Sequence, residues 1–130
     1  MRRDDDLLAK VARAAFLLLA GAICFASLAP AGWLPRLLWS YHLEHFAAFY
    51  LVALSMAAAR YRAHVHRLLI DIAVLATVLE GLRLFIPAHQ LYVTEDWAAD
   101  LGGTLAALAP VMIGDFRRSF RSRAPAADGV

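Results

Sequence analysis

The chain has 130 residues, of which 62% are hydrophobic and 18% are charged, and its formal net charge is +2. Ordinary soluble domains are about 45–50% apolar. The composition, with a mean hydropathy of +0.58, therefore excludes an ordinary soluble domain and favours a membrane protein. The small net charge also argues against a nucleic-acid-binding protein. The single cysteine, Cys24, cannot form an internal disulfide.

Four apolar segments follow one another along the chain, each near the ~20 residues that a membrane-spanning helix needs. They cover residues 11–29, 41–59, 68–86 and 97–113. Prolines, glycine or charged residues separate them, as is typical of connections between helices. We predict an all-α, polytopic membrane protein with four transmembrane helices in a single domain over residues 1–116. The basic residues 117–130 are predicted to form a disordered cytoplasmic tail.

The first segment has one alternative interpretation, a cleavable signal peptide. Its apolar stretch is longer than the ~7–15 residues usual in such peptides. The acidic run Asp4–Asp6 also interrupts the basic leader that a signal peptide requires. These features favour a retained membrane helix.

The distribution of Lys and Arg predicts the orientation. Most of the 13 basic residues lie before the first segment, between the second and third, or after the fourth. Basic residues accumulate on the cytoplasmic side of a membrane. We therefore expect both termini in the cytoplasm of a bacterium, the chain in its inner membrane, and the loops at residues 30–40 and 87–96 on the outer side.

This topology brings ionisable side chains from several segments to one depth, near the outer membrane surface. The predicted functional cluster consists of His42, His45, Glu80, Arg83, His89, Asp96 and Asp100. At ~1.5 Å of rise per residue, we expect these side chains to extend from the outer membrane interface into the outer leaflet. Charged groups inside a membrane are costly and mark functional sites by default.

The fourth segment has a clear helical phase. At ~100° per residue, Asp96, Asp100, Gly103 and Ala107 fall on one face. Small residues at this spacing let membrane helices approach closely. We predict that Gly102 and Gly103 lie at a helix-packing contact and that the two aspartates point into the bundle.

Structural explanations compete with functional ones at several positions. Asp96 fits the first turn of a helix, where acids complement the helix dipole. Glu80 and Arg83 are spaced to form a pair of their own. Asp71 lies one turn from Arg67, which predicts an ion pair at the membrane interface.

Four short motifs, over residues 41–108, resemble the VanZ-like family of small bacterial membrane proteins. HLEHFAAFY places His45 and Phe46 at the family's H-F, and EGLR places Glu80 at its E-x-x-Q. FIPAH matches the following F-x-P loop, and DWAADLGG supplies Asp96 and Gly103 at the family's spacing. The resemblance implies the family's four-helix membrane domain.

The sequence departs from the family pattern at five positions. Tyr41 and His42 stand where the family has Asp and Lys, Arg83 where it has Gln, His89 where it has Arg, and Asp100 where it has Asn. Two of these changes introduce opposite charges. We hypothesise that Arg83 pairs with Asp100, or with Glu80 and Asp100 together.

The resemblance implies a role in the cell envelope, where the family is linked to resistance to teicoplanin-type glycopeptide antibiotics. The first hypothesis is that the cluster binds a lipid-linked envelope component, with Arg83 meeting an anionic group such as phosphate. An accessory subunit of a membrane complex is the main alternative. A membrane-embedded enzyme is another, because the H-x-x-H spacing of His42 and His45 suits a metal. A transporter or proton relay is a fourth. The residues favour a non-enzymatic protein without a cofactor or metal, and no catalytic residue is assigned.

Overall fold

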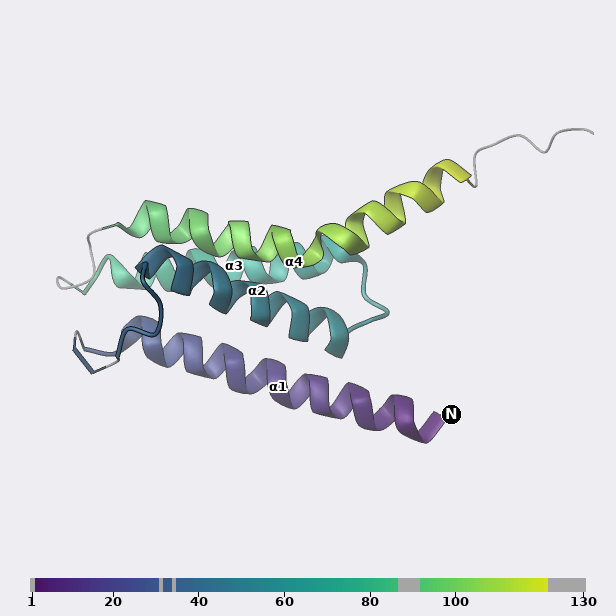
Figure 1. The fold of residues 1–130 in the computed structure, drawn as a ribbon, viewed down its shortest axis with the longest axis horizontal. Coiled ribbons are helices and arrows are strands. Elements are labelled where there is room, and N and C mark those ends of the chain that lie inside the picture. Colours follow the sequence, from purple (N-terminus) through teal and green to yellow (C-terminus); the bar gives the residue numbers. More distant parts are fainter. Residues whose placement is uncertain (1, 31, 34, 87–91, 122–130) are drawn as a thin grey trace, which may run out of the picture.

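A computed structural model describes residues 2–30, 32–33, 35–86 and 92–121 of the chain. The described residues form four α-helices: α1 (Arg2–Leu28), α2 (Tyr41–Ala59), α3 (Val65–Arg83) and α4 (Val93–Arg121). Successive helices run in opposite directions, so the C-terminal ends of α1 and α3 lie beside the N-terminal ends of α2 and α4 (Figure 1). The prediction of an all-α fold is confirmed.

The helix boundaries differ from the predicted segments at several points. The bounds of α2 are those predicted, whereas α1 starts at Arg2 rather than at residue 11 and α3 ends at Arg83 rather than at residue 86. The fourth helix continues to Arg121, so the prediction of disorder is wrong for residues 117–121. No glycine or proline interrupts the chain there, and basic residues are favourable at a helix C-terminus. The remaining residues of the predicted tail lie outside the described part of the chain.

The second helix, α2, occupies the centre of the bundle. It packs most extensively on α4 and also contacts α1, whereas α3 packs mainly on α4. The core is built from apolar side chains of α2, α3 and α4, namely Phe49, Ala53, Met56, Leu68, Ile72, Ala76, Leu79, Ala107 and Leu108. Helix α1 adds the partly buried Phe16, Ile23 and Cys24 to it.

A glycine sets the close approach of α2 and α4. A Cβ atom added to Gly103 would clash with the carbonyl oxygen of Phe46 and lie 3.0 Å from the backbone nitrogen of Tyr50. At Gly102 an added Cβ would meet only the ring of Phe46, at an ordinary 3.5 Å. Both glycines lie at a helix-packing contact as predicted, and the partner is α2, but only Gly103 brings the two backbones together.

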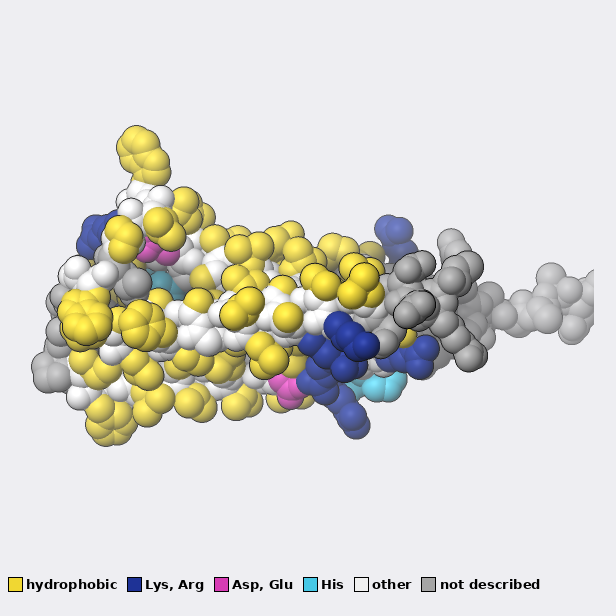
Figure 2. Space-filling view, turned by 90° about the horizontal axis from the view of Figure 1, so that it is seen from below, with side chains coloured by type: hydrophobic (Ala, Val, Ile, Leu, Met, Phe, Trp, Pro, Cys, Tyr) yellow, Lys and Arg dark blue, Asp and Glu magenta, His cyan; other side chains and the backbone are white. Residues whose placement is uncertain are grey.

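The outside of the bundle is largely apolar. Figure 2 shows hydrophobic side chains over most of the visible face, with Lys and Arg gathered at the end where α2 is followed by α3. Three helices are long and apolar enough to cross a membrane, over Leu7–Leu28, Tyr41–Ala59 and Val93–Phe120. Exposed apolar surface of this extent marks a membrane protein rather than a soluble one.

Helix α3 is not among these three, because it carries four charged side chains: Arg67, Asp71, Glu80 and Arg83. Asp71 forms the expected type of ion pair but with a different partner, since its Oδ2 lies 2.6 Å from Nη1 of Arg60. The predicted pairing with Arg67 is therefore wrong. Arg60 follows the last residue of α2, so this contact links α2 to α3 across the short turn.

We expect Gly103→Ala to destabilise the bundle by about 1–3 kcal/mol, the usual cost of overpacking, because the new methyl group meets rigid backbone of α2. The measurement is reversible unfolding in mild detergent. Gly114→Ala on the same helix is the control, since nothing lies within 4 Å of a Cβ added there. It should leave stability unchanged or raise it, because Ala favours helix by up to about 1 kcal/mol. Equal losses in the two variants would contradict this account of Gly103.

Candidate functional site

Polar side chains from α2, α3 and α4 converge where α3 ends and α2 and α4 begin. We call this set the polar cluster; it comprises Tyr41, His42, His45, Glu80, Arg83, Asp96 and Asp100. The predicted convergence of all the sequence candidates except His89 is confirmed. His89 lies outside the described residues.

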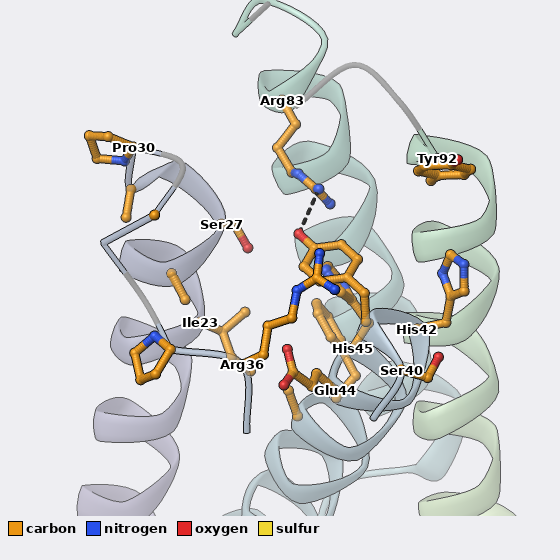
Figure 3. Close-up of a pocket in the computed structure, with 17 residues that line it drawn as sticks. Ile23, Ser27, Pro30, Arg36, Ser40, His42, Glu44, His45, Arg83 and Tyr92 are labelled. Atoms are coloured by element: carbon orange, nitrogen blue, oxygen red, sulfur yellow. Dashed lines mark hydrogen bonds between the residues drawn. The ribbon is translucent and has the colours of Figure 1, made fainter. Parts of the chain in front are cut away.

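Arg83 lies at the centre of the polar cluster and is only 2% exposed. Its Nη1 atom donates to both carboxylate oxygens of Glu80 at 2.8 Å and to Oδ2 of Asp96 at 2.9 Å. Its Nη2 atom donates to the hydroxyl oxygen of Tyr41 at 2.8 Å (dashed line in Figure 3). One guanidinium therefore connects α2, α3 and α4.

The expected pairing of Arg83 with Asp100 is wrong, although its expected pairing with Glu80 is confirmed. Asp100 lies one helical turn further into the bundle than Asp96. Because Arg83 is the last residue of α3, its guanidinium lies level with the first turn of α4 and meets Asp96 instead.

Two His–Asp pairs link α2 to α4. Nδ1 of His42 lies 2.9 Å from Oδ1 of Asp96, and Nδ1 of His45 lies 2.8 Å from Oδ1 of Asp100. The two helices run in the same direction (Figure 1). Residues three apart on α2 therefore face residues four apart on α4, each about one turn deeper. His42 is thus not the metal-binding partner of His45 that the H-x-x-H spacing suggested.

The structure shows that Asp96 is more than a helix-capping acid. Its side chain is fully buried and accepts hydrogen bonds from Arg83 and from the ring of His42. Asp100, Gly103 and Ala107 are also buried, which confirms the predicted inward face of α4. Thr104 donates its hydroxyl proton to the carbonyl oxygen of Asp100 at 2.8 Å.

Sequence reasoning missed Tyr41 as a member of the polar cluster. Its ring centroid lies 4.7 Å from that of His45 and 5.6 Å from the guanidinium carbon of Arg83. The helical phase contained the signal, because Tyr41 lies one turn before His45 on the same face of α2.

A cavity of about 600 Å³ adjoins the polar cluster, between the end of α1 and the beginning of α2. The wall formed by α1 and the residue that follows it is mainly apolar and includes Ile23, Ala26 and Ala29. The opposite wall is polar and includes Tyr41, His42, His45 and Arg83 (Figure 3). Figure 2 shows acidic and histidine side chains inside a hollow at this end of the molecule. The cavity therefore combines an apolar side with a hydrogen-bonding side.

Glu44 positions the segment that borders the cavity. Its Oε1 atom accepts hydrogen bonds from the backbone nitrogens of Leu37 at 2.5 Å and Leu38 at 2.7 Å. This contact anchors the chain next to Arg36, whose side chain extends into the cavity (Figure 3). Sequence reasoning identified neither Arg36 nor the role of Glu44, because both depend on how the connection folds back over α2.

Comparison of the chain with protein-family models, with curated proteins and with solved structures finds no match. The resemblance of the sequence motifs to the VanZ-like family stays a prediction.

We expect Arg83→Leu to destabilise the protein by about 3–5 kcal/mol, because it leaves the buried carboxylates of Glu80 and Asp96 without their shared counter-charge. Arg60→Leu is the matched control. It breaks an ion pair whose side chains are 48% and 45% exposed, and such pairs contribute about 0–1 kcal/mol. Unfolding in mild detergent measures both. A loss for Arg83→Leu no larger than for the control would contradict the central role of this guanidinium.

A double-mutant cycle tests which aspartate Arg83 contacts. Combining Arg83→Leu with Asp96→Asn should give a clear coupling energy, of about 0.5–3 kcal/mol for groups in direct contact. The coupling with Asp100→Asn should be smaller. A larger coupling with Asp100→Asn than with Asp96→Asn would favour the pairing of Arg83 with Asp100 that the sequence suggested.

Proposed function

We propose that the chain is a VanZ-like, multi-pass protein of the bacterial inner membrane that crosses the membrane four times, with both termini in the cytoplasm. The apolar exterior and three sufficiently long apolar helices support a membrane location. The gathering of exposed arginines at the end opposite the polar cluster supports the orientation, since basic residues favour the cytoplasmic side. These arginines are Arg60, Arg62, Arg67, Arg117 and Arg118.

The charges of α3 are compatible with a fourth crossing. Glu80 and Arg83 are buried and paired with each other, so they do not face lipid. Asp71 pairs with Arg60 near the basic end of the bundle. A charge that faces a partner inside a bundle costs much less than one exposed to hydrocarbon. The residues between these two ends of α3 are predominantly apolar.

Cysteine accessibility tests this topology. In a Cys24→Ala background, we expect Leu37→Cys and Thr94→Cys to react with a membrane-impermeant maleimide in intact spheroplasts, because the polar-cluster end faces outward. Arg62→Cys should react only after lysis. All three positions are exposed. Labelling of position 62 in intact spheroplasts would show that the orientation is opposite to the proposed one. Protection of position 94, with positions 37 and 62 behaving as expected, would show that α3 does not cross the membrane.

We further propose that the cavity binds the polar head of a lipid-linked envelope component. The observation that carries this proposal is the combination of an apolar wall on α1 with a polar wall beside the polar cluster. A lipid-linked molecule has both kinds of surface, and binding sites of about 300–1,000 Å³ accommodate ligands the size of a head group. The attached chain would extend along the apolar surface of α1.

The arginine expected to meet an anionic head group is Arg36 rather than Arg83. Both terminal nitrogens of Arg83 already donate to protein acceptors, and the neighbouring carboxylates disfavour an anion. Arg36 is exposed and extends into the cavity (Figure 3). An arginine fork suits a phosphate.

Filling the cavity should weaken lipid binding. Ala48 lines it, so Ala48→Phe should lower binding of a polyprenyl-phosphate-linked sugar at least tenfold in nanodiscs, measured by native mass spectrometry. Ala58→Phe is the matched control, because Ala58 is an exposed residue of the same helix that does not line the cavity. Equal binding by both variants would contradict the proposed site.

The same two variants, Ala48→Phe and Ala58→Phe, test the proposal in cells. A deletion strain should become more susceptible to a teicoplanin-type glycopeptide, and the wild-type chain and Ala58→Phe should restore resistance where Ala48→Phe does not. Binding in nanodiscs without any change in susceptibility would retain the lipid site and reject the antibiotic role.

A further inference from the structure

Three side chains from three different helices bring metal-binding atoms together inside the bundle. His45 of α2, Glu80 of α3 and Asp100 of α4 each offer one such atom, and these atoms all lie within 4.8 Å of one another. The side chain of His45 is 11% exposed, and those of Glu80 and Asp100 are 3% and 1% exposed. Imidazole nitrogen and carboxylate oxygen together form a common donor set for divalent metals.

One oxygen of this group has no partner. Oδ1 of Asp100 lies 2.8 Å from His45, but Oδ2 is buried and, within the described part of the chain, makes no hydrogen bond. An unsatisfied buried carboxylate oxygen is costly. Its position inside a cluster of other potential ligands points to a bound cation.

The charges of the polar cluster also indicate a bound cation. Three carboxylates, those of Glu80, Asp96 and Asp100, are buried in the polar cluster, and the guanidinium of Arg83 pairs with the first two. Asp100 is left with the imidazole of His45 beside it, which in its neutral form supplies no countercharge. Buried charges persist only when they are paired or bind metal. A single divalent cation would supply the missing charge.

We propose that His45, Glu80 and Asp100 bind one divalent transition-metal ion, with Zn²⁺ the best match to one imidazole and two carboxylates. This site does not depend on lipid binding by the cavity. Nδ1 of His45 would bind the metal in place of its hydrogen bond to Asp100, whose free Oδ2 is available as a ligand.

The surrounding residues are suited to orient these ligands. Nε2 of His45 lies 3.8 Å from Oδ2 of Asp96, a position from which a small movement would give the carboxylate–histidine contact that supports metal ligands. Arg83 fixes both oxygens of Glu80. Because His45 also lines the cavity, a metal ion has a route to the site.

The test begins with a variant that removes a competing site. His64 and His66 are exposed and their rings stack at 5.4 Å, so they offer a site for adventitious metal. The full chain carrying His64→Ala and His66→Ala is purified in mild detergent, freed of metal with a chelator and titrated with Co²⁺. We expect visible absorption that saturates at one equivalent and is displaced by Zn²⁺.

Two variants of the ligands and one control complete the titration. Asp100→Asn and Glu80→Gln should each weaken Co²⁺ binding at least tenfold. Asp71→Asn, which changes an exposed carboxylate of α3 outside the polar cluster, should bind as before. Absence of the absorption, or binding that Asp100→Asn and Glu80→Gln leave unchanged, would overturn the proposal.

X-ray absorption at the zinc edge provides a measurement that does not require the ligand variants to fold. On the wild-type chain with one equivalent of Zn²⁺, a single imidazole with oxygen ligands supports the site. Two imidazoles would place the metal outside the proposed ligand set, as an adventitious ion only, and would overturn the proposal.

Discussion

The burial of Arg83 is the constraint on which the polar end of the bundle depends. A guanidinium removed from water is stable only where the surrounding groups replace its hydration. Glu80 and Asp96 supply the negative charge and Tyr41 supplies a further acceptor. Because these partners belong to three helices, satisfying one side chain fixes the height of α3 relative to α2 and α4. The two His–Asp pairs are compatible with that alignment.

His45 connects the buried charges to the cavity. It contacts Asp100 on one side and lines the cavity on the other. A cation bound among the carboxylates would reduce their repulsion of an anion in the cavity, where Arg36 provides positive charge. The proposed metal site and the proposed lipid site are thus electrostatically compatible, although each rests on separate observations.

The sequence predicted where the helices lie and which face of α4 is buried. Apolar runs bounded by breakers located all four helices, with the bounds of α2 as predicted. The 3.6-residue period placed Asp96, Asp100 and Gly103 on the buried face of α4, because side chains four apart project in nearly the same direction. Alternation of helix direction then brought the polar ends of α2, α3 and α4 together. These results depend only on local geometry and on the distribution of apolar residues.

By itself, then, the sequence determined the helices, their apolar exterior and the group of ionisable residues that meet at one end. The tertiary structure decided which of those residues pair. Arg83 meets Asp96 rather than Asp100, and Asp71 meets Arg60 rather than an arginine of its own helix. Periodicity gives the face of a helix but not its offset along a neighbour. For Arg83 the offset of α3 along α4 decides the partner, and a shift of one turn would exchange Asp96 for Asp100.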